Sequence, residues 1–97
     1  MASKSYIKQA IKVFIEKNSV LFVEETNWYV GVTSDPQTRH RAHKTPVLWK
    51  HWEADHHDHA RDIEKHFLER GFRGDTGGGT RPRYIYVYKA AGPKSGR

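Results

Sequence analysis

Apolar residues recur at helical spacing in two parts of the chain. Between residues 5 and 17 they repeat every three or four positions, with lysines between them, which predicts an amphipathic helix. The same spacing from residue 55 to 70, ended by Gly71, predicts another helix. A short helix is predicted from residue 36 to 44, because Asp35 can cap it and a proline is tolerated in its first turn.

Three other runs predict β-strands. Residues 20–23 are uniformly apolar, residues 28–32 are rich in aromatic and β-branched side chains, and residues 83–90 alternate tyrosine with isoleucine and valine. The short polar gap between the first two strands favours an antiparallel hairpin. Residues 45–52, with one proline and two tryptophans, are expected to form a connection that covers an edge of the core. The predicted order is α-β-β-α-α-β, in a single α+β domain whose three-stranded, mainly antiparallel sheet is flanked by helices.

The charge balance narrows the choice of partner. The 97 residues include 17 Lys and Arg against 11 Asp and Glu, a net charge of +6 with neutral histidines. A basic domain of this size favours an anionic partner, above all nucleic acid. The absence of cysteine excludes disulfides and thiolate zinc sites. No run approaches a membrane span and no signal peptide is recognisable, so we expect a cytoplasmic protein that does not contact a membrane.

The helix predicted at 55–70 carries a carboxylate among its apolar positions. At about 100° per residue, Glu64 falls between Phe67 and Leu68 on the face that should pack against the core. A buried carboxylate is costly unless it is paired, hydrogen-bonded or bound to a metal. Glu64 is therefore a candidate functional residue. The alternative is a place at the rim of the apolar face, from which the carboxylate reaches water.

Another group of candidate residues lies in and after the second predicted strand. Arg39 and His43 are four residues apart, so they share one face of the short predicted helix. Glycine weakens a strand, so Gly31 indicates either the close approach of a helix or ligand, or a β-bulge. Together with Tyr29, these residues bring a phenol, a guanidinium and an imidazole close to one another. The combination indicates a phosphate site.

The end of the chain offers weaker signals. Gly77–Gly79 lack the lysine and spacing of a P-loop. The adjacent Arg81 and Arg83 indicate a basic lip that could follow a sugar–phosphate backbone, or an ordinary connection. The alternating tyrosines of the last strand could stack bases or pack beneath a helix; they are Tyr84, Tyr86 and Tyr88.

Histidines gather just before and within the helix predicted at 55–70. With the neighbouring aspartates they could bind a transition metal. However, His56, His57 and His59 do not share one face of a helix. We therefore favour surface groups near a phosphate, which gain charge at mildly acidic pH.

The residues from Tyr29 to Glu64 together resemble the GIY-YIG endonuclease superfamily. The triplet Tyr29-Val30-Gly31 is similar to its second motif, and Arg39, His43 and Glu64 follow in the family's order. The resemblance spans about residues 19–90. The family's first motif, G-[IV]-Y, would fall at residues 19–23, which contain neither glycine nor tyrosine.

The resemblance implies an endonuclease that hydrolyses phosphodiester bonds, most simply in double-stranded DNA. Glu64 would bind Mg²⁺ or Mn²⁺, Arg39 would clamp the phosphate, Tyr29 would position the attacking water, and His43 would act as the base. The residues expected to contact nucleic acid are Gly31, Arg41, Lys44, Arg81 and Arg83. Two alternatives remain, a module that binds nucleic acid without cutting it and a small interaction protein. Specificity is expected to need a homodimer or a partner protein.

Overall fold

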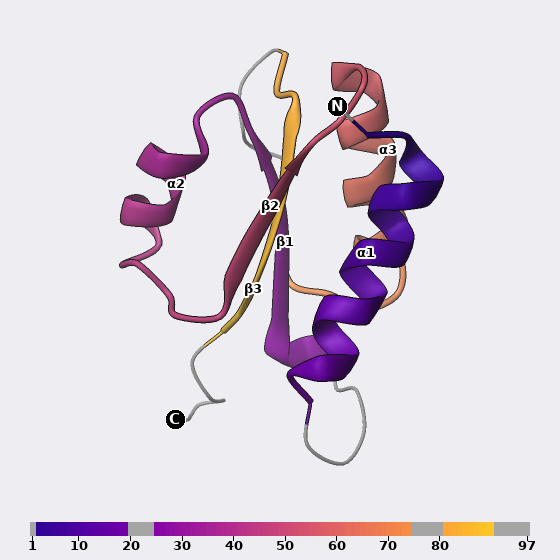
Figure 1. The fold of residues 1–97 in the computed structure, drawn as a ribbon. Helices are drawn as coiled ribbons and strands as arrows, with labels where there is room; N and C mark the ends of the chain where they lie inside the picture. Colours follow the sequence, from indigo (N-terminus) through magenta and orange to yellow (C-terminus); the bar gives the residue numbers. More distant parts are fainter. Residues whose placement is uncertain (1, 20–24, 75–80, 91–97) are drawn as a thin grey trace.

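The computed structural model describes residues 2–19, 25–74 and 81–90. Figure 1 shows their elements in order: α1 (Lys4–Lys17), the 3₁₀ turn η1 (Glu25–Asn27), β1 (Trp28–Thr33), α2 (Pro36–Ala42), β2 (Trp49–Glu53), α3 (His57–Leu68) and β3 (Tyr84–Lys89). No helix in these ranges is long and apolar enough to cross a membrane.

The three strands form one antiparallel sheet in the order β1-β3-β2. The predicted α+β class and antiparallel sheet are confirmed. The predicted order of elements is not, because helices and strands alternate along the described residues. The strand predicted at 20–23 lies outside them.

The prediction of a connection at residues 45–52 was wrong, because β2 occupies Trp49–Glu53. This strand carries Lys50 and His51 between its tryptophans, so its sequence lacks the apolar alternation that marks a half-buried strand. Its conformation is fixed instead by pairing with β3, in which Trp49 lies opposite Tyr88 and Glu53 lies opposite Tyr84.

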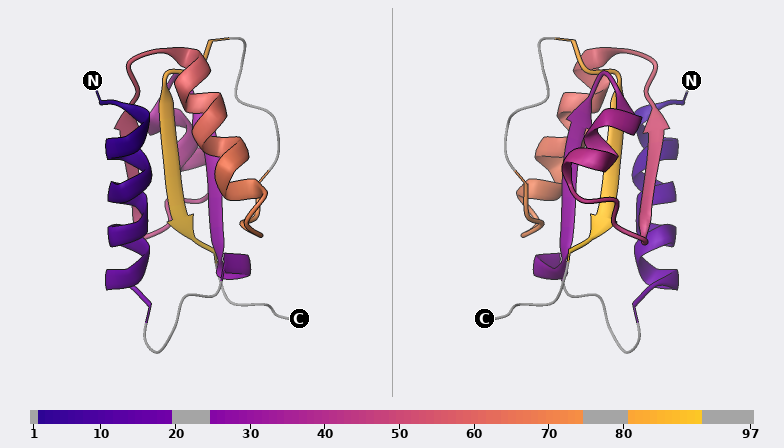
Figure 2. Two further views of the ribbon diagram at one scale, coloured as in Figure 1. Left: turned by 90° about the vertical axis from the view of Figure 1, so that its right-hand side faces the viewer. Right: turned by 90° about the vertical axis from the view of Figure 1, so that its left-hand side faces the viewer.

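Helices cover both faces of the sheet. Helices α1 and α3 lie on one face and α2 lies on the other, as the edge-on view of Figure 1 and the rotated views of Figure 2 show. The hydrophobic core fills the space between the sheet and helices α1 and α3. Its fully buried members include Ile7, Ile11, Val30, Ile63, Ile85 and Val87.

The outer edge of β1 is paired with the chain that follows α3. The Val30 N–H donates to the Arg73 carbonyl oxygen at 2.9 Å, and the Arg73 N–H donates to the Trp28 carbonyl oxygen at 2.9 Å. Gly74 has a φ of +156°, and a Cβ there would collide with the Val30 carbonyl oxygen. The described neighbours of β1 are thus β3 on one side and Arg73 on the other, which fixes Tyr29 firmly in the sheet.

Side chains at the helix ends cap α1 and α2. The Ser3 hydroxyl accepts the Tyr6 N–H at 3.2 Å. Asp35 accepts the Thr38 N–H at 3.3 Å, and Pro36 follows it in the first turn of α2. The start of α2 is therefore the one that the sequence predicts. Hydrogen bonds to Thr38 hold the pKa of the Asp35 carboxyl below its usual value.

Candidate functional site

Three tyrosines gather on the face of the sheet that α2 covers. Tyr29 in β1 lies directly opposite Tyr88 in β3, and their rings stack with centroids 5.0 Å apart and planes 19° apart. Tyr86 stacks on Tyr29 at 6.2 Å and on Trp49 of β2 at 4.6 Å. Tyr86 and Tyr88 of the last strand thus pack against aromatic rings of the neighbouring strands, and a role of the tyrosine stripe in stacking bases stays a prediction.

His43 links two of these tyrosines. It is the C-cap residue of α2, with its Nε2 3.0 Å from the Tyr86 hydroxyl and its Nδ1 3.0 Å from the Tyr88 hydroxyl. Its ring centroid is 4.9 Å from that of Tyr29. A neutral imidazole has one donor and one acceptor nitrogen, so one tyrosine donates to His43 while the other accepts from it. The structure thus brings together Tyr29 and His43, which were both predicted as site residues.

Gly31 makes room for the Tyr86 ring. The two residues are cross-strand partners in a continuous register from Trp28 to Thr33, so the β-bulge considered from the sequence is wrong. A Cβ on Gly31 would lie 2.8 Å from Tyr86 Cε2 and still closer to Cζ and Oη. The close approach that the glycine indicated is therefore made by Tyr86. A contact of Gly31 with nucleic acid stays a prediction.

The two tyrosines bonded to His43 differ in exposure. Tyr86 is 3% exposed, whereas Tyr88 is half-buried. Burial raises the pKa of the Tyr88 phenol to about 12, with the Tyr29 phenol adding to the rise and Arg73 opposing it. The Tyr88 phenol is therefore neutral at physiological pH. Tyr86 is placed to orient His43, because so little of its surface meets solvent.

A cavity of about 550 Å³ opens beside His43 and Tyr88. Lys44 and Lys89 are among its lining residues, and the exposed Val47 lies on its apolar side. The cavity thus combines two cations, an imidazole and a phenol with a small apolar surface. These are groups that can hold a phosphate and the sugar or base attached to it.

A strained turn borders this cavity. Lys44 and Thr45 have φ values of 66° and 48°, in the left-handed region that costs a non-glycine residue about 1–2 kcal/mol. A hydrogen bond from the Thr45 N–H to the His40 carbonyl oxygen, at 2.9 Å, holds the turn. The turn ends α2 at His43 and places Lys44 at the cavity.

The two predicted arginines of α2 lie in different surroundings. Arg39 is half-buried, one helical turn before His43, whose N–H donates to the Arg39 carbonyl oxygen at 3.1 Å. Arg41 is exposed, and its guanidinium donates to the Thr38 hydroxyl at 3.4 Å. Arg39 and Arg41 thus differ in burial, and a contact of the Arg39 guanidinium with the phosphate stays a prediction.

Glu64 is buried in α3, with only 3% of its surface exposed. The predicted position inside the apolar arc is confirmed, and the alternative of a rim position is wrong. Its Oε1 lies 3.5 Å from Arg61 Nη1. Because α3 and α2 cover opposite faces of the sheet (Figure 2), Glu64 lies on the opposite side of the sheet from Arg39 and His43.

Arg81 and Arg83 lie at the end of the sheet where β3 begins. They line a cavity of about 340 Å³ together with Asp55, His56 and His57. Arg83 also donates to the Asp55 carbonyl oxygen at 3.3 Å. Their role as nucleic-acid contacts stays a prediction, and the glycines at 77–79 lie outside the described residues.

Sequence reasoning missed Tyr86, Tyr88 and Trp49 as members of the site around His43. The alternation of tyrosines in the last strand showed that they share a face. It did not show that β3 lies between β1 and β2, which is what places that face beside Tyr29. Arg73 was also missed, since its approach to β1 depends on the chain after α3 returning to the sheet edge.

Comparison of the chain with protein-family models, curated proteins and solved structures found no match. Membership of the GIY-YIG superfamily therefore stays a prediction from the motif residues.

Proposed function

We propose that this protein is a metal-dependent DNA endonuclease of GIY-YIG type. The observation that carries the proposal is the chain Tyr88–His43–Tyr86, with both hydrogen bonds at 3.0 Å, beside a cavity lined by two lysines. Phosphodiester hydrolysis needs a group that removes a proton from the attacking water and positive charge that holds the phosphate. Both are present around this cavity.

The proton path follows from the tautomer of His43. With hydrogen on Nε2, His43 donates to the Tyr86 oxygen and Nδ1 accepts the Tyr88 proton. A water bound to Tyr88 passes its proton to the phenol oxygen as the phenol passes its own to Nδ1. Tyr88 stays neutral throughout, which agrees with its raised pKa of about 12. His43 is thus the base, and it acts through Tyr88.

The remaining predicted residues bind the substrate. Arg39 would clamp the phosphate with its planar guanidinium, assisted by Lys44 and Lys89 at the cavity. The Glu64 carboxylate fits Mg²⁺ or Mn²⁺ in donor type, because it offers a hard oxygen ligand. It is buried in α3, on the face of the sheet opposite α2 (Figure 2), so a metal held by Glu64 would lie away from a phosphate bound at this cavity. A metal ion that stabilises the charge developing on the leaving oxygen would therefore need ligands at the cavity itself, among the substrate's phosphate oxygens and water.

Nicking of supercoiled plasmid in Mg²⁺ or Mn²⁺ tests the proposal. We expect Tyr88→Phe to lower the rate about 100-fold or more, the range of general acid–base catalysis. Arg39→Ala should reduce nicking far more than Arg41→Ala, its matched control on the same helix. Circular dichroism establishes that each variant is folded. Nicking by folded Tyr88→Phe at the wild-type rate would refute the proposed proton path.

A nucleic-acid-binding module without catalysis is the second candidate. It is favoured by the position of Glu64, which is ion-paired with Arg61 in α3 on the face opposite α2. This function predicts salt-sensitive DNA binding and intact plasmid in either metal. Arg39→Ala would then weaken binding, whereas Glu64→Gln would leave it unchanged. Wild-type nicking that is abolished by Glu64→Gln, but retained by the matched Glu69→Gln, would exclude this alternative.

A further inference from the structure

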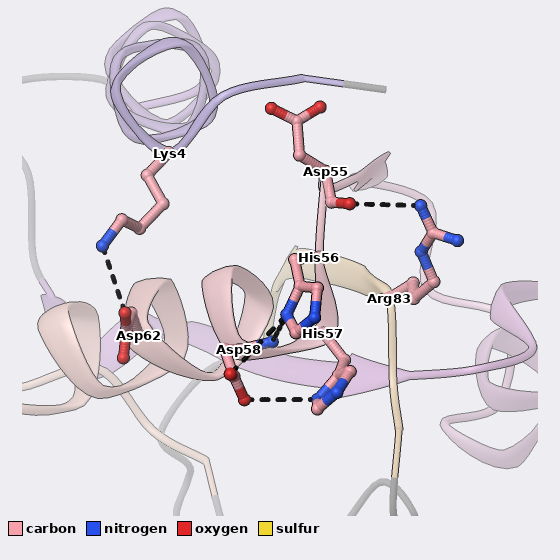
Figure 3. Close-up of polar contacts among 7 residues, drawn as sticks. All are labelled: Lys4, Asp55, His56, His57, Asp58, Asp62 and Arg83. Atoms are coloured by element: carbon pink, nitrogen blue, oxygen red, sulfur yellow. Dashed lines mark hydrogen bonds and ion pairs between the residues drawn. The ribbon is translucent and has the colours of Figure 1, made fainter.

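Two histidines and an aspartate converge at the start of α3, away from the tyrosine cluster. His57 Nδ1 lies 3.3 Å from one carboxylate oxygen of Asp58, and His56 Nδ1 lies 3.6 Å from the other. One ligand atom from each residue falls within 4.8 Å of the other two. Figure 3 shows the Asp58 carboxylate between the two imidazoles. We propose that this His56-His57-Asp58 cluster is a binding site for a divalent transition-metal ion, with Zn²⁺ as the best-fitting ion.

The spacing of the donors supports the proposal. Zn–N bonds of about 2.0–2.1 Å place two donors of a tetrahedral site about 3.3 Å apart. The His57–Asp58 separation of 3.3 Å matches that value. His56 Nδ1 lies 3.6 Å from the other Asp58 oxygen, and the three ligand atoms lie within 4.8 Å of one another, so side-chain rotations would complete three ligands.

The donor types select the metal. Imidazole nitrogens suit Zn²⁺, Cu²⁺ and Ni²⁺, whereas Mg²⁺ and Ca²⁺ prefer oxygen ligands. Two imidazoles with one carboxylate form a ligand set found in zinc sites that keep a position open. The cavity of about 340 Å³ adjoins both histidines, which leaves space for a water or an anion as the remaining ligand. Arg81 and Arg83 line the same cavity and favour an anion there.

Three features oppose metal binding and lower the affinity of the cluster for the ion. His56 Nδ1 accepts the Asp58 N–H at 3.1 Å as the N-cap of α3, and a metal on Nδ1 would replace this hydrogen bond. The positive end of the helix dipole repels a cation, as do the arginines of the cavity. The Asp58 carboxylate offsets part of this repulsion. We therefore expect an affinity for Zn²⁺ that is moderate but higher than the affinity of an isolated surface histidine.

Calorimetric titration of the metal-free full chain with Zn²⁺ tests the site. We expect one saturable site per chain whose affinity falls at least about tenfold in His57→Ala, since loss even of a group that merely orients a ligand costs 10–100-fold. Asp58→Asn should weaken binding as well. The matched control is His66→Ala, which should leave the affinity unchanged. His66 lies in the same helix and accepts a hydrogen bond from Arg70.

Co²⁺ absorption spectra give a second readout, since a site with few ligands produces visible bands that depend on its ligands. The bands should weaken in His57→Ala and persist in His66→Ala. Equal Zn²⁺ affinity in wild type and folded His57→Ala, or no saturable binding by wild type, would overturn the proposal. Neither measurement uses nucleic acid, so the result is independent of the nuclease proposal.

Discussion

Replacing Gly31 by alanine should destabilise the protein through one side chain, Tyr86. Carbon atoms pack at about 3.5–4.0 Å, but the new Cβ would lie 2.8 Å from Tyr86 Cε2. The ring must therefore move by roughly 0.7 Å or more. It is not free to do so, because it is 3% exposed, stacked on Trp49 at 4.6 Å and hydrogen-bonded to His43 at 3.0 Å.

The magnitude follows from three contributions. Overpacking costs about 1–3 kcal/mol, and loss of the hydrogen bond between Tyr86 and His43 costs about 0.5–1.5 kcal/mol. Alanine gains about 0.5–1 kcal/mol over glycine in a strand. We expect a net loss of about 2 kcal/mol in the free energy of unfolding, which lowers the Tm by about 8–16 °C in a domain of this size.

A double-mutant cycle measured by urea denaturation tests the mechanism. In a Tyr86→Ala background the obstructing ring is absent, so Gly31→Ala should be neutral or stabilising. The coupling between the two substitutions should then be about 2 kcal/mol, within the range for residues in contact. An equal cost of Gly31→Ala in both backgrounds would refute the steric argument, as would a Gly31→Ala protein as stable as the wild type.

Three further predictions concern ionisation and capping. Because the folded pKa of Tyr88 is about 12, above the usual value of about 10, the stability that depends on the neutral phenol is present below about pH 10 and lost as the pH rises through about 12. Ultraviolet titration of phenolate should show a late-titrating component that Tyr88→Phe removes. The pKa of Asp35 is lowered, so its contribution to stability is present above pH 4 and lost as the pH falls through the folded pKa; Asp35→Asn should flatten the acid limb of a Tm-against-pH profile. Ser3→Ala should cost about 1 kcal/mol in chemical denaturation, whereas Ser5→Ala, an exposed position inside α1, should not destabilise.

The sequence by itself determined the helices and the faces of the strands. Helix α1 was predicted at residues 5–17 and lies at Lys4–Lys17, and Asp35 with Pro36 fixed the start of α2. The burial of Glu64 followed from its angle on α3. These features depend on residues near one another in the chain, so periodicity and capping are sufficient to find them.

Tertiary structure alone decided which residues meet. Strand β2 exists because it pairs with β3, although its own residues lack an alternating pattern. The order β1-β3-β2 brings Tyr88 against Tyr29 and both within reach of His43, across more than half of the chain. It also places α2 and α3 on opposite faces, which separates Glu64 from the tyrosines. Such pairings depend on the free energy of the whole sheet and core, which local sequence does not encode. Side chains that share one face of a strand have no fixed partners until the order of the strands is set.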